Sequence, residues 1–381
     1  MIRKEILEIK RQFKPMESTI NRICCCYVGG ENKNIICKTV DAFHSLPEEE
    51  CFKYFEIFKK ALSGSIGKNL INLEFPLSAE EKDEPQDFLL QLRNSKLKDE
   101  DLLEEFFNQI ITTYEYTGNY AILLMNSDYD VPGKASDGST MDDASDEVFS
   151  YFLCCICPVE LSKPGLGFNE KENRLRNRER DWVVKVPDTA FLFPAFNDRC
   201  TDIHACLYYS RDGKNLQSNF VNQMLGCKLP MAAAEQKLSF QNVITDTLGT
   251  DCDYETVKTI HENLTEIIEE AQDSEDTLVF SKETVRKLFE SSGVDEKLMQ
   301  NFDTNFDNTI GKNAELVANN LAEKTFEVKT ANVVIKVDPE MTHLIETKVV
   351  DGRKCLVVEI DGGVEVNGIV VNSHESDSSH G

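Results

Sequence analysis

The sequence lacks a long apolar run. No stretch of its 381 residues approaches the roughly 18 consecutive apolar residues that a membrane-spanning helix needs. The opening segment MIRKEILEIKRQFKP alternates charged residues with Ile and Leu. It has no apolar block followed by a cleavage site of small residues, so it does not have the form of a secretory signal. We therefore expect a protein of the cytoplasm with no membrane partner.

Positive charge is scarce. The chain has 41 Lys and Arg residues against 67 Asp and Glu residues, and its formal net charge is −26 at pH 7. A general polyanion-binding surface requires clustered Lys and Arg side chains that neutralise phosphates and release counterions. The composition therefore argues against such a surface. We expect any contact with nucleic acid to be local or to pass through a protein partner.

Motifs for nucleotides and metals are incomplete. SGSIGKNL, residues 63–70, lacks the first glycine of a phosphate-binding loop and has Asn69 where that loop has a metal-binding hydroxyl. HENLT, which begins at His261, lacks the second histidine of a zinc-protease helix. Neither segment is predicted to be a site, and no cofactor is predicted.

What is present indicates an α+β protein in three parts. Single cores stop growing at roughly 250–300 residues, so 381 residues suggest more than one domain. Helical patterns and apolar strands such as NYAILLMNSDYD and EVFSYFLCCICPVEL predict an α/β mixed-sheet domain in residues 1–226. Two β-rich runs, RICCCYV and NIICKTV, predict a hairpin within it. Helical periodicity marks residues 227–322, and alternation around Asp-Gly turns predicts a small β meander in residues 323–372. Residues 373–381 are polar and are expected to form a disordered tail.

Cysteine, in contrast, is plentiful. Thirteen cysteines in a long chain, an odd number, fit reduced thiols better than a disulfide framework. RICCCYV places Cys24 and Cys26 on one face of a strand, and FLCCICPV does the same for Cys155 and Cys157. Two such strands side by side would offer four thiolates to zinc. The flanking residues are bulky and apolar, so we favour packing of these cysteines as small core residues.

A polar cluster, FNDRCTDIHACLYY, accompanies apolar strands at residues 196–209. Asp202 and His204 would project from one strand face, with Asp198 and Arg199 in the preceding loop, and a carboxylate that orients an imidazole makes a general base. A cation held by the acidic loop of residues 128–147 would complete a metal-dependent enzyme. However, EF-hand spacing is absent and no nucleophile or second acid is identifiable. We favour a loop held by Asx turns, with His204 partly buried.

The segment NRLRNRERDW carries Arg174, Arg176, Arg178 and Arg180 at a spacing of two. In an extended strand they lie on one face at ~6.6–7 Å intervals, close to the phosphate spacing of a stretched nucleic-acid strand. Guanidinium groups also suit phosphate oxygens. Arginines on an exposed edge strand can instead prevent association between sheets, and this alternative stays open.

Several segments resemble a known family along essentially the whole chain. They are LPEEECFKYFEIFKKALSGSIGKNL, DYDVPGK, CPVELSKPGL, RDWVVKVPDTAFLFPAFNDRCTDIHACLYY and DGRKCLVVEIDGGVEVNG. These are similar to the domain-of-unknown-function 4317 family of anaerobic Gram-positive bacteria, which implies a bacterial protein and supplies no catalytic residues. In the order of its parts the chain also resembles the bacterial 37-kilodalton nucleoid-associated proteins, which implies a role at the nucleoid.

From these patterns we expect a bacterial cytoplasmic protein that is not an enzyme. It would be nucleoid-associated or accessory to a nucleic-acid transaction, with DNA or a nucleoid protein as its partner and the four arginines as the contact. One alternative is a metal-dependent enzyme built on Asp202 and His204. The other is an acidic protein-interaction scaffold, which would show an exposed apolar patch on the helical region. The sequence predicts no oligomeric state.

Overall fold

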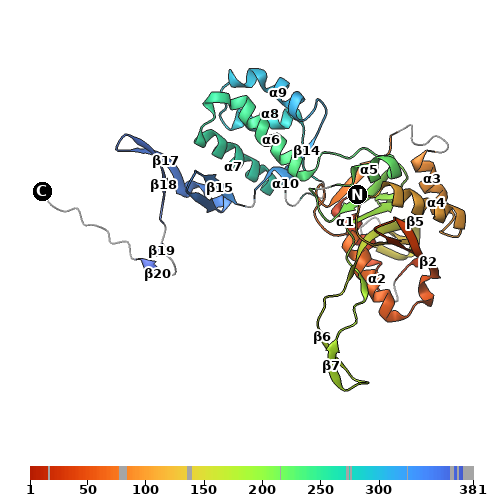
Figure 1. The fold of residues 1–381 in the computed structure, drawn as a ribbon. Coiled ribbons are helices and arrows are strands. Elements are labelled where there is room, and N and C mark those ends of the chain that lie inside the picture. The colour runs from red at the N-terminus through yellow and green to blue at the C-terminus, as the bar shows by residue number, and fades with distance from the viewer. Residues whose placement is uncertain are drawn as a thin grey trace. The chain divides into compact units, whose positions relative to one another are not determined.

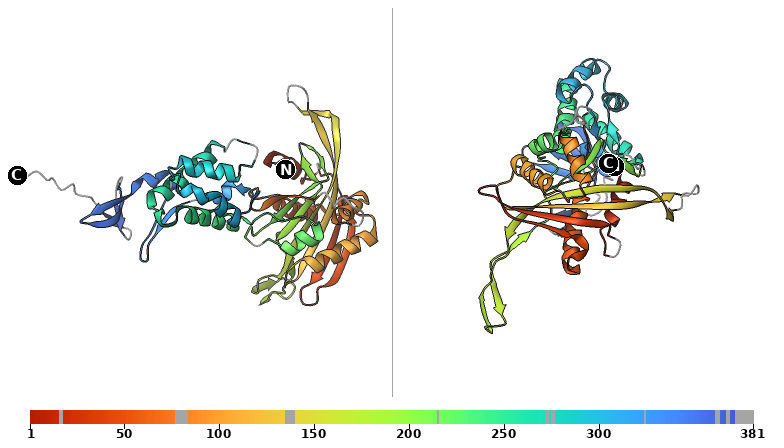
Figure 2. Two further views of the ribbon diagram at one scale, coloured as in Figure 1. Left: turned by 90° about the horizontal axis from the view of Figure 1, so that it is seen from above. Right: turned by 90° about the vertical axis from the view of Figure 1, so that its right-hand side faces the viewer.

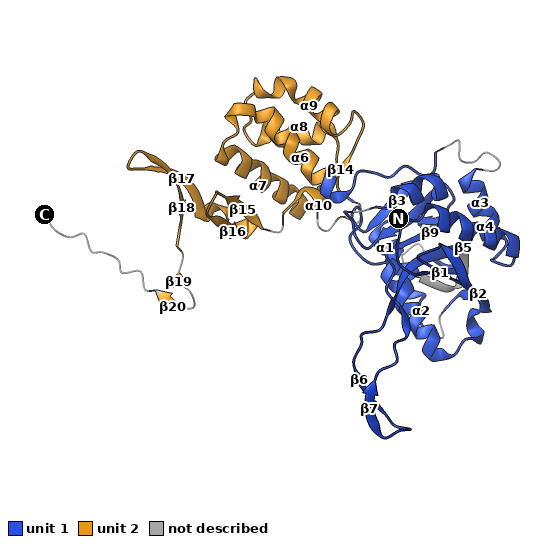
Figure 3. Cartoon of the chain, in the orientation of Figure 1, with its two compact units in different colours: residues 1–235, 275–277 blue, residues 236–274, 278–381 orange. Residues whose placement is uncertain are grey.

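The computed structural model describes residues 1–15, 18–76, 84–134, 140–214, 216–271, 274, 277–323, 325–360, 364–366 and 369–371. The chain divides into two compact units (Figure 3). Unit 1 comprises residues 1–235 and 275–277, and unit 2 comprises residues 236–274 and 278–381. Within the described ranges, no helix is long and apolar enough to cross a membrane. The predicted disordered tail lies outside the described residues.

An eight-stranded sheet forms the centre of unit 1 (Figure 1). Seven of its strands run in the order β2-β1-β4-β5-β9-β12-β3. The eighth, β8, pairs with the last residues of β5. Their bounds are β1 (Ile20–Gly29), β2 (Asn34–Ala42), β3 (Leu70–Glu74), β4 (Tyr120–Lys134), β5 (Thr140–Leu161), β8 (Trp182–Val184), β9 (Thr189–Phe193) and β12 (Ala205–Ser210).

The α+β class and the hairpin formed by β1 and β2 are confirmed. Every pairing in the sheet is antiparallel, where a mixed sheet was expected. Parallel neighbours need a long crossover connection, usually through a helix. Here β1 connects directly to β2, and β4 connects directly to β5, so these neighbours run in opposite directions.

Helices cover both faces of this sheet (Figure 2). One face packs against α1 (Arg3–Arg11) and α2 (Glu48–Ala61). The other face packs against α3 (Pro85–Asn94), α4 (Glu100–Thr113) and a short helical segment that begins with α5 (Ser218–Phe220). The side chain of Asp99 caps α4 by accepting hydrogen bonds from two backbone N–H groups of its first turn. The buried stripe of α4 includes Leu103, Phe106, Phe107 and Ile110 at helical spacing.

Strands β4 and β5 are buried on both faces because each face has its own helical layer. Such strands have continuous apolar sequences rather than an apolar and polar alternation. AILLM in β4 and YFLCCIC in β5 fit this description. The sheet therefore has two separate cores, one on each side.

Between β5 and β8 the chain leaves the sheet as a long hairpin, which we call the arm and define as residues 162–181 (Figure 2). Its strands β6 (Leu166–Asn169) and β7 (Arg174–Asn177) pair only with each other. At the base of the arm, the backbone N–H of Ser162 donates to the carbonyl of Asp181 at 2.8 Å. Nε of Arg180 donates to the carbonyl of Ser162 at 2.7 Å.

The helices of unit 2 surround a core rich in phenylalanine. Their bounds, with a short strand pair, are α6 (Ala233–Leu248), α7 (Tyr254–Glu270), α8 (Lys282–Ser291), α9 (Phe302–Thr309), α10 (Ala318–Leu321), β13 (Val279–Phe280) and β14 (Leu316–Val317). Phe240, Phe289, Phe302 and Phe306 are fully buried. Asp253 caps α7 by accepting a hydrogen bond from the backbone N–H of Thr256.

Three antiparallel strand pairs follow these helices along the chain. They are β15 (Phe326–Lys329) with β16 (Val334–Val337), β17 (Ile345–Val350) with β18 (Arg353–Val358), and β19 (Val364–Val366) with β20 (Ile369–Val371). The predicted meander would join consecutive strands into one sheet. In the described residues each pair stays separate, since a 3₁₀ segment at Pro339–Leu344 interrupts the chain between β16 and β17.

Candidate functional site

The predicted zinc ligands lie on opposite faces of the sheet. Cys24 and Cys26 belong to the core beneath α3 and α4, whereas Cys155 and Cys157 belong to the core beneath α1 and α2. Strand β4 also separates β1 from β5. The structure therefore does not bring the four thiols together. Burial raises the pKa of both Cys24 and Cys26 to about 12, so these thiols stay protonated.

Asp202 and His204 occupy the end of a hairpin and the turn after it. The hairpin consists of β10 (Ala195–Asn197) and β11 (Cys200–Asp202), so His204 lies beyond the strand. The carboxylate of Asp202 accepts a hydrogen bond from the backbone N–H of His204 at 2.9 Å and another from the Asn197 amide at 2.7 Å. These bonds hold the turn, as in an Asx turn. The side chain of His204 is exposed rather than partly buried.

Asp198 and Arg199 form the two-residue loop of this hairpin, with φ values of 51° and 59°. Left-handed conformations at both positions are typical of a type I′ turn. The guanidinium of Arg199 pairs with Glu8 of α1 at 3.1 Å and donates to the carbonyl of Pro132 at 2.9 Å. Tyr129 donates to the same carboxylate at 2.9 Å. This network ties the hairpin to α1, which is a structural role.

Among the described residues, no group of three or more His, Cys, Asp or Glu side chains is placed to hold a metal ion. The side chains of residues 134–146, in the acidic loop named as a cation site, lie outside those described. Asp128, at the start of that loop, accepts hydrogen bonds from Ser150, Lys96 and Asn21. Its oxygens therefore have partners within the chain.

The four predicted phosphate contacts lie on the arm, and two of them lie on a strand. Arg174 and Arg176 share one face of β7, while Arg178 and Arg180 follow its last residue. Glu172 pairs with both Arg174 and Arg176 at 2.9 Å. Arg176 also pairs with Glu179, and Arg180 donates to Ser162 as described above. Three of the four guanidinium groups therefore have partners within the arm.

The opposite face of the arm is apolar. Phe168 of β6 is paired with Leu175 of β7, and Leu166 lies two residues before Phe168, so the three side chains share one face. Leu166 is 77% exposed, Phe168 60% and Leu175 67%. No helix or loop among the described residues covers this face, in contrast to both faces of β5.

An apolar groove of about 560 Å³ lies between α2 and strands β1, β4 and β8. Trp182, the single tryptophan of the chain, lines it and directly follows the arm. Tyr54 and Cys25 lie on the opposite wall, with the hydroxyl and thiol 3.7 Å apart. The region where the arm joins the sheet thus also presents apolar surface.

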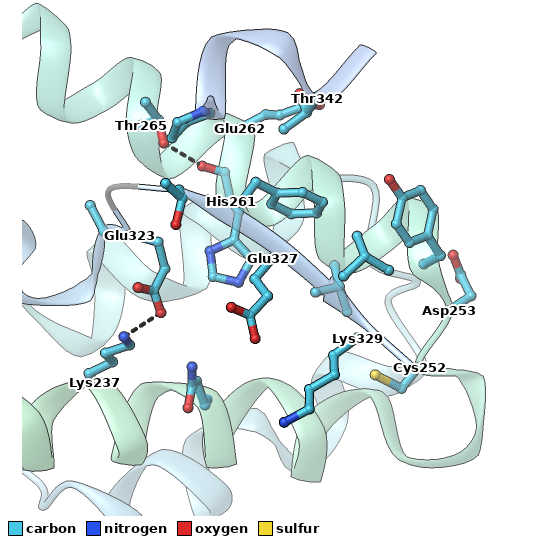
Figure 4. Close-up of a pocket in the computed structure, with 18 residues that line it drawn as sticks. Lys237, Cys252, Asp253, His261, Glu262, Thr265, Glu323, Glu327, Lys329 and Thr342 are labelled. Carbon is cyan, nitrogen blue, oxygen red and sulfur yellow. Dashed lines mark hydrogen bonds and ion pairs between the residues drawn. The ribbon is translucent and has the colours of Figure 1, made fainter. Parts of the chain in front are cut away.

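Unit 2 contains a pocket of about 680 Å³ with polar and apolar lining residues (Figure 4). Lys237 and Gln241 of α6 line one side, His261 of α7 lines a second, and strand β15 with the residues before it lines a third. The imidazole of His261 points into this space and lies beside Glu327 (Figure 4). Burial lowers the pKa of His261 and favours its neutral form, although nearby Glu323 acts in the opposite direction.

Residues 1–369 match a family model described as a domain of unknown function, DUF4317. The chain belongs to this family. The match spans residues of both units and confirms the predicted family resemblance. No curated protein matches the chain. The resemblance to nucleoid-associated proteins therefore stays a prediction. Because the family is one of unknown function, a function for this chain has to be inferred from its own structure.

Sequence reasoning missed the pocket and the apolar face of the arm. His261 was set aside because its motif is incomplete, and the other pocket residues are spread from Lys237 to Thr342 without a shared pattern. The sequence of the arm did contain a signal for this face. LGF has two apolar residues at a spacing of two, and RLR has one apolar residue between two arginines, on the other side of a polar turn. The scaffold alternative expected an apolar patch on the helical region, whereas this patch lies in unit 1.

Proposed function

We propose that this chain is a non-enzymatic binding protein whose arm docks onto a partner protein. The apolar face formed by Leu166, Phe168 and Leu175 carries the proposal, because each side chain is more than half exposed. Contiguous exposed apolar patches mark interaction sites in soluble proteins. Burial of one such side chain contributes roughly 1.5–3 kcal/mol, so three of them suffice for the centre of an interface.

The charge of the arm indicates the chemistry of the partner. The arm has six Lys and Arg residues and four Asp and Glu residues, in a chain whose net charge is −26. A partner with an apolar cleft bordered by carboxylates would complement both the apolar face and this local positive charge. Since Arg174 and Arg176 already pair with Glu172, we expect charge to steer association more than to anchor it.

Nucleic acid is the second candidate, with the nucleoid of a bacterial cytoplasm as the location. A two-stranded ribbon fits the major groove of duplex DNA, and the arm carries four arginines. The internal pairing of three of these arginines and the charge of −26 both weaken this candidate. The exposed apolar face also has no role in contacts to phosphate.

The test replaces Phe168 with a photo-crosslinking amino acid in the full chain and irradiates bacterial cells that produce it. The captured protein is then purified, and its affinity is measured for the original chain and for two variants. One variant combines Leu166→Ser, Phe168→Ser and Leu175→Ser. The matched control combines Arg174→Gln and Arg176→Gln on the opposite face of the arm.

The apolar variant should weaken binding by about a hundredfold or more, whereas the control should change mainly the association rate. Equal affinity of the captured protein for the original chain and the apolar variant would contradict the proposal. The same proteins are titrated with labelled DNA and RNA across a salt series. Salt-dependent binding that is lost in the arginine variant and kept in the apolar variant would favour nucleic acid instead.

A further inference from the structure

The carboxylates of the unit 2 pocket already have partners. Glu323 pairs with Lys237, and Glu327 pairs with Lys336 at 2.8 Å. The other two lining carboxylates are also engaged: Asp253 accepts hydrogen bonds from Thr256, and Glu262 accepts one from Thr342. Although acidic residues outnumber basic residues in the lining, lysines offset the charges of Glu323 and Glu327, which weakens the attraction of the lining for a cationic ligand.

The side chains of the lining that still have free hydrogen-bond donors are basic or neutral rather than acidic. Lys329, His261 and Gln241 line the pocket. Their side chains make no hydrogen bond or ion pair with any of the described residues. Lys329 extends toward the helix that carries Lys237, into the same space that the His261 imidazole faces (Figure 4). An ammonium, an imidazole and an amide can together donate hydrogen bonds to both oxygens of one anionic group.

The pocket also has an apolar wall. Tyr254 and Phe326 meet with ring centroids 6.3 Å apart, and Val257 lies one helical turn from Tyr254. The ring of His261 packs edge-on against Phe326, with ring centroids 6.4 Å apart. A few polar groups that converge beside apolar and aromatic walls are the usual composition of small-molecule sites, and the volume of about 680 Å³ is within their range.

We propose that this pocket binds a small carboxylic acid with an apolar body. The carboxylate lies among Lys329, His261 and Gln241, and the apolar body packs against Tyr254 and Phe326. The arrangement disfavours an amine of the same shape, because Lys329 would repel it and the nearby carboxylates are already paired. This inference concerns unit 2 and stands independently of the function proposed for the arm.

The experiment uses the full chain with ¹³C-labelled histidine and follows the imidazole signals by NMR. The probes are 3-phenylpropionate, its cationic counterpart 3-phenylpropylamine, and inorganic phosphate. We expect 3-phenylpropionate to shift the His261 signal in a saturable way. Lys329→Gln should weaken this binding by about tenfold or more, as expected for loss of a charged hydrogen bond.

Lys348→Gln provides the control, since Lys348 lies on β17, outside the pocket lining, and pairs with Glu346. It should leave the affinity within about twofold of the original. Because Lys329 is exposed, its replacement should not unfold unit 2, and the signal of His343, which also belongs to unit 2, reports this. Equal binding of 3-phenylpropylamine or inorganic phosphate, or an unchanged affinity in Lys329→Gln, would overturn the proposal.

Discussion

Strand β5 and the arm that follows it belong to one continuous stretch of chain, yet their environments are opposite. In β5, Phe152 and Cys155 point to different faces and both are fully buried. In the arm, Phe168 lies between Gly167 and Asn169 and is 60% exposed. Packing of helices on both faces explains the apolar residues of β5. The apolar residues of the arm belong to neither core of unit 1, which supports the binding role proposed for them.

The sharpest expected contrast is in thiol reactivity. Near neutral pH, Cys24 in the core should be alkylated at least about a thousandfold more slowly than Cys37 on exposed β2, because burial raises the Cys24 pKa to about 12. Peptide mass spectrometry after timed exposure to iodoacetamide measures both rates. In guanidinium chloride the two rates should converge. Comparable rates in the native protein would mean that the core of unit 1 opens readily.

Truncation of one phenylalanine in each region tests the same comparison through stability. Phe152→Ala should destabilise unit 1 by about 3–5 kcal/mol, since the ring packs against Phe106 and Phe191 at 6.2 and 5.7 Å. Phe168→Ala should change stability by less than about 0.5 kcal/mol. Urea titration followed by the fluorescence of Trp182 reports on unit 1 alone. A large cost for Phe168→Ala would show that the arm packs on its own unit.

The hairpin of β10 and β11 is an intermediate case, because both a core and polar contacts attach it. Ala195 and Phe196 of β10 are buried in the core beneath α1 and α2, and Arg199 adds an ion pair with Glu8 of α1. Arg199→Ala should destabilise unit 1 by about 1.5–3 kcal/mol, since it removes the main partner of the mostly buried Glu8. Lys53→Ala, which breaks an exposed pair with Glu56, should cost less than about 1 kcal/mol. Similar costs for the two variants would contradict the structural role assigned to Arg199.

The smallest expected effect concerns His261 in unit 2. Burial lowers its pKa in the folded state, so the unfolded chain takes up this proton first as the pH falls. Stability should therefore decrease from about pH 6.5, the ordinary histidine pKa, down to the folded pKa. His261→Gln should lose this part of the pH dependence. Hydrogen exchange of unit 2 amides at several pH values measures the stability of unit 2 in each protein. The same dependence of stability on pH in both proteins would refute the prediction.

Much of the fold was predictable because local patterns and burial agree. Apolar runs marked β4 and β5, and two β-rich runs marked the hairpin of β1 and β2. The alternation of side chains along a strand assigned the cysteines of each strand to shared faces. It could not tell which faces coincide between strands, because that depends on the register through β4, which pairs Cys24 and Cys154 with Leu124. The zinc hypothesis depended on this missing information.

The positions of the site residues could not be predicted where they depend on the end of a strand or on segments that are distant in the sequence. Asp202 and His204 have the spacing of one strand face, but β11 ends at Asp202 and the chain turns. Arg174 and Arg176 do share one strand face, as their spacing predicts, but Glu172 forms ion pairs with both of them. His261 and Lys329 line one pocket because β15 packs against α7 through Phe326, and no local pattern in the sequence encodes that packing.

The hydrogen bond between Ser162 and Asp181 places the entry and exit of the arm side by side. A segment whose ends already meet can be lengthened, shortened or exchanged at little entropic cost to the strands that flank it. Natural variation, or a protein engineer, can therefore replace the arm with a different hairpin at this point. The layered sheet would keep its structure, and under the function proposed above the bound partner would change.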